Sequence, residues 1–156
     1  MKHALRTWVV CCALLGACVN ETTELALATP DRAAFEQDVY PVLLRDCAFH
    51  ACHGTTERFF QVFGPGRGRL DPPLMPLDAA SPAEVDHSYE RARAMIDARA
   101  PAESLLLRKP LAVNAGGSGH EGADDLGRNV YQSKLEPGYG AIARWVQGLP
   151  AVPVGP

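Results

Sequence analysis

The sequence is notable first for what it lacks. After its first residues no apolar run is long enough to cross a bilayer as a helix. Basic residues are not in excess, because 15 lysines and arginines stand against 18 aspartates and glutamates. A nucleic-acid-binding surface is normally basic, so we expect no nucleic-acid partner. No internal repeat and no convincing strand pattern is present, and the sequence therefore predicts an all-α domain.

Motifs of common catalytic and nucleotide-binding sites are also missing. The glycine-rich residues 114–122 lack the preceding strand and the Lys-Ser/Thr pair of a phosphate-binding loop. Ser118 and His120 lie too close in sequence for a catalytic pair, and no third group is evident. We therefore expect no enzymatic activity and no small-molecule substrate.

The N-terminus has the features of a bacterial export signal. Lys2 and Arg6 make its start basic, and Trp8 to Leu15 form an apolar run too short to span a membrane. The following residues up to Cys18 resemble a lipobox. This resemblance implies that residues 1–17 are a lipoprotein signal, removed before Cys18, whose thiol is then lipidated. The alternative is an ordinary signal peptide in which Cys18 is incidental.

Export would place the chain in the cell envelope, lipid-anchored to the membrane and facing the periplasm or the cell exterior. Residues 18–30 lack periodicity and end at Pro30, so we interpret them as a tether to a domain at 31–150. Loss of Lys2 and Arg6 would leave 13 of the 15 basic side chains against 18 acidic ones, a formal net charge of −5.

The number and position of the cysteines limit the possible roles of the thiols in this domain. Of the five cysteines, Cys11 and Cys12 belong to the signal and Cys18 to the anchor, which leaves only Cys47 and Cys52. In an oxidising compartment, two thiols this close form a disulfide or hold a cofactor. A disulfide closing so short a loop would contribute little to stability on the chain-entropy model.

The stretch from Cys47 to Gly54 points to a particular cofactor. Cys52 is followed at once by His53, as in chains that attach haem through two thioethers and ligate its iron with the adjacent imidazole. Four residues separate the cysteines, whereas the common spacing is two. A zinc or copper site built from Cys47, His50, Cys52 and His53 is a further hypothesis, but the four ligands lie within seven residues and would need a strained backbone to surround one ion tetrahedrally.

A haem iron has a sixth position, for which the sequence offers two main candidates. His120 lies among glycines, and Met75 lies between Leu74 and Pro76. We favour His120 and keep Met75 as the alternative. Bis-histidine ligation would give a lower potential than His/Met ligation. The other histidines are poorer candidates by position: His3, His50 and His87.

Helical patterns and breakers predict about four short helices joined by long Gly/Pro-rich loops. The first begins at Asp31, is kinked or split by Pro41 and ends at Cys47. The others begin at Ser81, at Pro101 and at Pro137, with ends near Ile96, before Pro110 and at Gln147. Long loops are expected at 55–80 and 111–130.

The order of these features resembles the small c-type cytochrome domain of planctomycete and myxobacterial proteins. The matching features are an amphipathic helix before Cys47–Gly54, the segment Ser104–Pro110, the glycine loop around His120, and Tyr139 and Trp145 in a terminal helix. The resemblance covers roughly residues 33–148. It implies a cytochrome c-like helical bundle with haem c attached to Cys47 and Cys52, proximal His53 and distal His120.

Our first hypothesis is therefore a membrane-anchored monohaem c-type cytochrome that exchanges single electrons with a redox partner protein. Its haem would lie against apolar side chains, for which we considered Phe59, Phe63, Leu105 and Trp145. Arg67 and Arg69 are candidates for pairing with the haem propionates. The alternative hypothesis is a haem-free lipoprotein with a cytochrome-like frame closed by a Cys47–Cys52 disulfide, acting as a binding or structural module.

Overall fold

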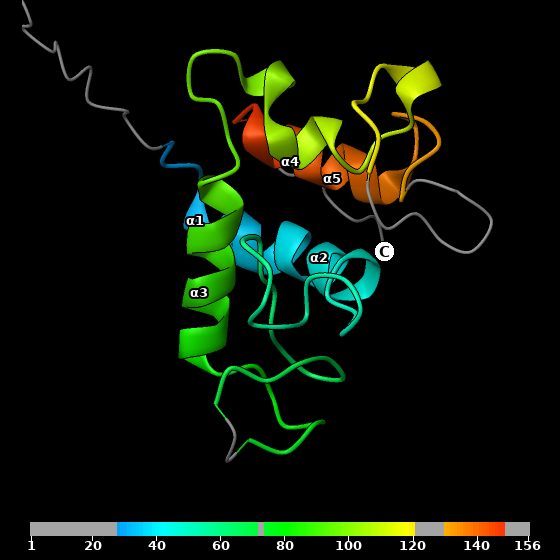
Figure 1. Ribbon diagram of the computed structural model, residues 1–156. Coiled ribbons are helices and arrows are strands. Elements are labelled where there is room, and N and C mark those ends of the chain that lie inside the picture. The colour runs from blue at the N-terminus through cyan, green and yellow to red at the C-terminus, as the bar shows by residue number, and fades with distance from the viewer. Residues whose placement is uncertain (1–27, 72–73, 121–129, 149–156) are drawn as a thin grey trace, which may run out of the picture.

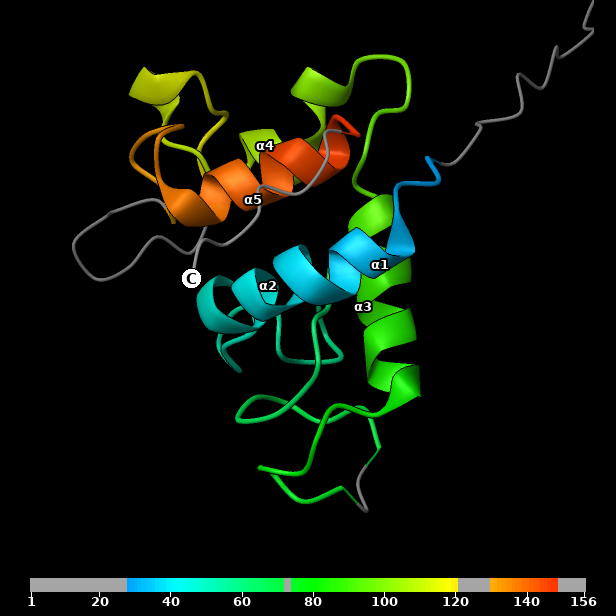
Figure 2. The same cartoon turned by 180° about the vertical axis from the view of Figure 1, so that it is seen from behind.

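The computed structural model describes residues 28–71, 74–120 and 130–148 (Figures 1 and 2). Within these ranges the chain is all-α, as predicted, and its one β-bridge joins Leu111 to Tyr131. In this described part of the chain, no helix has the length and apolar content that crossing a membrane requires. The predicted signal peptide, Cys18 and most of the tether lie outside the described residues, so those assignments stay predictions.

The first helical segment has three parts: α1 (Arg32–Ala34), a π-helical turn (Phe35–Val39) and α2 (Tyr40–Asp46). Asp31 caps its start by accepting a hydrogen bond from the Ala34 amide. The predicted interruption by Pro41 is confirmed, and it takes the form of the π turn, in which the Tyr40 amide donates to the Phe35 carbonyl. Proline lacks the amide that would continue the α-helical pattern, so the register shifts just before it.

The remaining elements follow the predicted order. Ser81 and Glu84 form the predicted capping box of α3 (Pro82–Arg93), and α5 spans Pro137–Val146. The single helix expected after Pro101 is instead a 3₁₀ turn (Pro101–Glu103) followed by α4 (Leu105–Arg108). The two are separate because Ser104 has an extended ψ of 136°. A last 3₁₀ turn, Val113–Ala115, follows α4.

The first helical segment lies at the centre of the molecule. Figures 1 and 2 show α4 and α5 on one side of it, the long loop after Cys47 on the other, and α3 across one end. Phe35 is fully buried there, and its ring centroid lies 5.2 Å from that of Trp145 on α5 and 5.4 Å from that of Tyr89 on α3. Tertiary packing of this aromatic cluster therefore joins three helical segments that are individually short.

Residues 28–30, expected to belong to the tether, contact the domain. The Tyr89 hydroxyl donates a hydrogen bond of 2.8 Å to the Pro30 carbonyl, and the indole N–H of Trp145 donates one of 2.7 Å to the Asp31 carbonyl. Arg93 reaches the Ala28 carbonyl at 3.5 Å. The chain therefore packs against the domain from residue 28 onward, three residues before the expected start.

A buried ion pair holds the long loop against α3. Arg69 donates from Nε and Nη2 to the two carboxylate oxygens of Glu84, at 2.8 and 2.9 Å, and the Glu84 side chain is 0% exposed. The amides of Leu70 and Ser81 also donate to this carboxylate. Burial alone would raise the pKa of Glu84, but the hydrogen bonds from Arg69 and the two amides outweigh it, so its pKa lies below the ordinary value.

This lowered pKa predicts an acid-labile loop. The stabilisation from the Glu84 carboxylate is complete above its unfolded pKa of about 4.3, and it is lost as the pH falls through the lower folded pKa. Glu84→Gln should lower the melting temperature at neutral pH and weaken its dependence on pH below 4, measured by circular dichroism. Glu36→Gln is the control, because that exposed carboxylate pairs with Arg32 at the surface. Equal melting curves for both variants would contradict the prediction.

Candidate functional site

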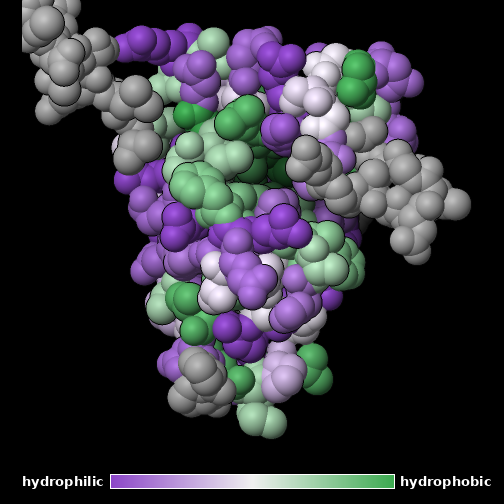
Figure 3. All heavy atoms as spheres, viewed as in Figure 1, coloured by the Kyte–Doolittle hydropathy of each residue, from purple (hydrophilic) through white to green (hydrophobic). Residues whose placement is uncertain are grey.

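A cavity of about 370 Å³ lies between the end of α2 and the segment that contains α4. This volume falls within the range of about 300–1,000 Å³ that small-molecule and cofactor sites occupy. Figure 3 shows the hollow, with hydrophobic residues in its floor. The apolar side chains that line it come from α2, α4 and α5 and from the segments between helices: Leu43, Phe59, Phe60, Met95, Leu105, Leu106, Pro110, Val130 and Ile142.

The segment from Cys47 to Gly54 forms one wall of this cavity. Cys47 follows the last residue of α2, and its amide donates to the Leu43 carbonyl. The amide of His53 donates a hydrogen bond of 3.1 Å to the Cys47 carbonyl, and this bond closes the four-residue spacer into a compact turn. Gly54 ends this turn because a Cβ there would lie 2.2 Å from the Ala48 carbonyl oxygen. The wide cysteine spacing therefore still brings both cysteines and His53 to the cavity wall.

His53 is oriented by a backbone contact. Its Nδ1 lies 3.0 Å from the Phe60 carbonyl oxygen, and because a carbonyl only accepts, Nδ1 carries the proton. Nε2 is then the nitrogen available to a ligand in the cavity, the arrangement that metal-binding histidines use. Burial lowers the pKa of His53, more than the Phe60 hydrogen bond raises it, so the imidazole is held neutral.

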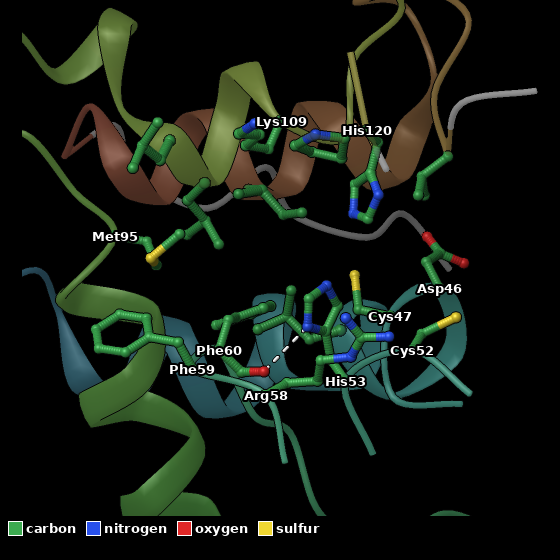
Figure 4. Close-up of a pocket in the computed structure, with 16 residues that line it drawn as sticks. Asp46, Cys47, Cys52, His53, Arg58, Phe59, Phe60, Met95, Lys109 and His120 are labelled. Atoms are coloured by element: carbon green, nitrogen blue, oxygen red, sulfur yellow. Dashed lines mark hydrogen bonds between the residues drawn. The ribbon is translucent and has the colours of Figure 1, made fainter. Parts of the chain in front are cut away.

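His120 reaches the same cavity from the opposite wall. The two imidazoles point toward each other across it (Figure 4), with ring centroids 5.8 Å apart and planes at 73°. The turn before His120 is attached to α4, since the Ser118 amide donates to the Arg108 carbonyl at 2.9 Å. Gly117 permits this attachment because a Cβ there would meet the Leu111 carbonyl oxygen at 1.9 Å.

Both cysteines line the cavity as free thiols, so the structure contains no Cys47–Cys52 disulfide. In Figure 4 the Cys47 sulfur points toward the space between the imidazoles, and the Cys52 sulfur lies at the outer end of the cavity. Burial raises the pKa of Cys47 to about 12, with a smaller contribution from Asp46. No group of three or more metal-ligating side chains is assembled within residues 28–71, 74–120 and 130–148, so the four-ligand zinc or copper arrangement is not present.

The structure does not bring the other candidate ligands to the cavity. Met75 is 65% exposed, its amide donates to the Asp78 carboxylate, and it does not line the cavity. His50 is exposed in the turn between the cysteines. His87 pairs with the Gln61 amide oxygen at 2.8 Å and does not line the cavity. Of the two main candidates for a sixth ligand, only His120 faces His53.

Four expectations about the lining are corrected. Phe59 and Leu105 do line the cavity, but Phe63 and Trp145 are core residues away from it. Arg69 is bound to Glu84, and Arg67 donates to the Leu44 carbonyl at 2.7 Å, so neither arginine is available there. The basic residues at the cavity are instead Arg58 and Lys109.

Sequence reasoning missed several cavity residues for identifiable reasons. Arg58 lies five positions after His53, a proximity that was a usable signal. Lys109 lies in the segment Ser104–Pro110 that the resemblance singled out, but no role was assigned to it. Met95 carried no signal, because it reaches the cavity only through the packing of the segment after α3. Asp46 precedes Cys47 directly and was also overlooked.

The donor set is compatible with one metal ion held between two imidazoles. Imidazole nitrogens bind metal ions at about 2 Å, so two rings that bind one ion from opposite sides have centroids about 6 Å apart. The observed separation of 5.8 Å agrees with this value. Neutral His53 with its proton on Nδ1 meets the further requirement that a ligating nitrogen be unprotonated. Apolar walls and two thiols in the lining suit a flat, apolar cofactor such as haem.

No protein-family model matches the sequence, and neither the curated proteins nor the solved structures show a significant match to it.

Proposed function

We propose that this protein is a membrane-anchored monohaem c-type cytochrome, a one-electron carrier with a cytochrome c-like fold. The proposal rests chiefly on one observation: His53 and His120 face each other 5.8 Å apart across an apolar cavity that Cys47 and Cys52 also line. Cys47, Cys52 and His53 lie within seven residues of one another, whereas His120 lies 67 positions after His53, so its presence at the same cavity is independent of the motif.

Each residue has a separate role in this proposal. Cys47 and Cys52 form the thioether bonds to haem c, His53 is the proximal iron ligand, and His120 is the distal one. The Phe60 carbonyl orients the His53 ring through Nδ1. Bound haem supplies a one-electron iron couple, whose potential the axial ligands and the surrounding polarity set.

The rest of the cavity keeps water from the cofactor and orients it. Leu43, Leu106 and Ile142 provide apolar contacts that lower the local dielectric constant. Arg58 and Lys109 are exposed cations at the cavity, which suits them to pair with carboxylate groups of the cofactor at the solvent boundary. The protein then needs no substrate site, and its partner is another redox protein in the cell envelope.

A visible spectrum tests the proposal. The full chain is produced in a bacterial host with haem-attachment machinery, membranes are solubilised, and reduced-minus-oxidised spectra are recorded. We expect sharp α and Soret bands that remain with the polypeptide after acid-acetone extraction and denaturation. Covalent attachment is expected because each thiol adds across a vinyl group, with its proton going to the neighbouring carbon.

Variants of the thiols are the matched controls. Cys47→Ala and Cys52→Ala should each leave one thioether, and the double variant should lose its colour on acid-acetone extraction. A colourless wild-type chain with no titratable thiols would instead mean a disulfide-closed module, and it would overturn the cytochrome proposal. Lipidation is tested separately, because Cys18→Ser should release the protein from the membrane without changing its spectrum.

A further inference from the structure

Asp46 is an acidic residue at the cavity to which the proposed function assigns no role. It is the last residue of α2, directly before Cys47, and it lines the cavity. Among the described residues around the cavity, it is the only carboxylate. Figure 4 shows it beside Cys47, at the end of the cavity and level with the space between the two imidazoles.

The Asp46 carboxylate is held in place by two neighbours. The Tyr131 hydroxyl donates to Oδ2 at 2.8 Å, and Arg45 donates at 2.6 and 2.7 Å. Gly138, in the first turn of α5, leaves room for this cluster, because a Cβ there would lie 2.8–2.9 Å from all three polar groups. Three separate elements therefore converge on one carboxylate beside the cavity.

These contacts keep Asp46 ionised. Burial would raise the pKa of Asp46, but the hydrogen bonds from Arg45 and Tyr131 outweigh it and leave the pKa below its ordinary value. The charge of Arg45 offsets that of Asp46 in the cavity only in part. The Arg45 side chain is 63% exposed and so is screened by water, whereas that of Asp46 is 16% exposed. Tyr131 is buried and uncharged.

We propose that Asp46 is a potential-setting residue, whose fixed negative charge stabilises the oxidised over the reduced cofactor. This inference rests on the proposed function. The oxidised iron carries one more positive charge than the reduced iron, and an anion next to an apolar cavity therefore favours oxidation. Asp46 acts by its charge, with Arg45, Tyr131 and Gly138 holding it in position.

Potentiometric titration of Asp46→Asn against wild type is the test. Asparagine keeps the size and the hydrogen-bonding oxygen but removes the charge. At the wild-type midpoint potential we expect the reduced-to-oxidised ratio to rise about tenfold, from the interaction of unit charges across a protein-like dielectric. Tenfold corresponds to about 59 mV for a one-electron couple. Asp86→Asn is the control, because Asp86 pairs with Arg32 and lies away from the cavity; its midpoint should be unchanged.

Tyr131→Phe distinguishes an effect of the Asp46 charge from a structural effect of the hydrogen bonds around Asp46. It removes a hydrogen bond to Asp46 but keeps the carboxylate, so it should not raise the midpoint. If Asp46 only supports the fold, Tyr131→Phe and Asp46→Asn should shift the midpoint together, and the inference is overturned.

If Asp46→Asn fails to load haem, Arg45→Gln takes its place. This variant removes the counter-ion but keeps the carboxylate, so it should lower the midpoint. An unchanged or raised midpoint overturns the inference.

The two proposals fail differently. A wild-type chain without covalent haem has no midpoint to measure, and it overturns both. A haem-containing wild type whose midpoint equals that of Asp46→Asn leaves the cytochrome proposal standing and overturns only the role of Asp46.

Discussion

Replacing His120 with alanine is expected to change the visible spectrum from that of a low-spin, six-coordinate haem protein to that of a high-spin, five-coordinate one. The imidazole of His120 faces that of His53 across the cavity, and under the proposed function its loss would remove the second nitrogen ligand of the iron. The reduced variant should also bind carbon monoxide, which the wild type should bind poorly. Spectra of both oxidation states, with and without carbon monoxide, measure the effect.

Two substitutions serve as controls for His120→Ala. His50→Ala removes an exposed histidine from the turn between the cysteines, and Met75→Ala removes the alternative ligand, which is 65% exposed. Neither should alter the spectrum. His120→Met should restore six-coordination with a raised potential, since thioether ligation raises it. An unchanged spectrum in His120→Ala would show that His120 is not a ligand, and a changed one in Met75→Ala would transfer the role to Met75.

Phe35→Ala is expected to lower the free energy of unfolding by about 3–5 kcal/mol, enough to threaten folding of a domain this size. The Phe35 ring is 0% exposed, and it contacts aromatic rings on α2, α3 and α5. Its loss would open a cavity at the point where the helical segments meet. Urea denaturation followed by circular dichroism gives the magnitude.

Phe59→Ala is the matched control, because it removes the same side chain from a site that is 69% exposed. Its cost should stay below about 1 kcal/mol. Comparable losses of stability in the two variants would mean that the aromatic cluster around Phe35 is not what holds the helices together. Phe59 lines the cavity mouth, so its variant also reports whether that side chain affects cofactor loading independently of stability.

Local sequence signals predicted the helices well. The Ser81 capping box, the cap at Asp31, the break near Pro41 and the terminal helix all depend on neighbouring residues, and the structure confirms them. The helix after Pro101 was predicted as one piece, because no local signal marks the extended Ser104. That residue is instead fixed by its hydrogen bonds, in which Oγ accepts from the Asp97 amide and donates to the Pro101 carbonyl.

The candidate site was predictable only where its residues lie together in sequence. Cys47, Cys52 and His53 stand out as a motif, and the turn that joins them brings all three to one cavity wall. The choice of His120 over Met75 rested on its glycine neighbours, and the structure places only His120 opposite His53. Whether these residues bind haem is still a prediction.

The charged residues illustrate what sequence could not show. Arg67 and Arg69 looked suitable for a cofactor's carboxylates because they are cationic and near Cys52 in the chain. The fold directs Arg69 to Glu84 and Arg67 to a backbone carbonyl, while Arg58 and Lys109 reach the cavity. The position of a charged group in the molecule depends on contacts between segments far apart in sequence, and these contacts cannot be read from the neighbouring residues.

By itself, the sequence determined the all-α character of the domain, the helix starts and the Cys47–Gly54 motif, because capping, proline geometry and motif spacing act over a few residues. Only the tertiary structure decided that His53 faces His120, that Nδ1 of His53 is held by Phe60, and that the Asp46 side chain lines an apolar cavity. These arrangements depend on the packing of α2, α4 and α5 around Phe35 and its neighbours. The cavity is a property of that packing, to which residues from Leu43 to Ile142 contribute.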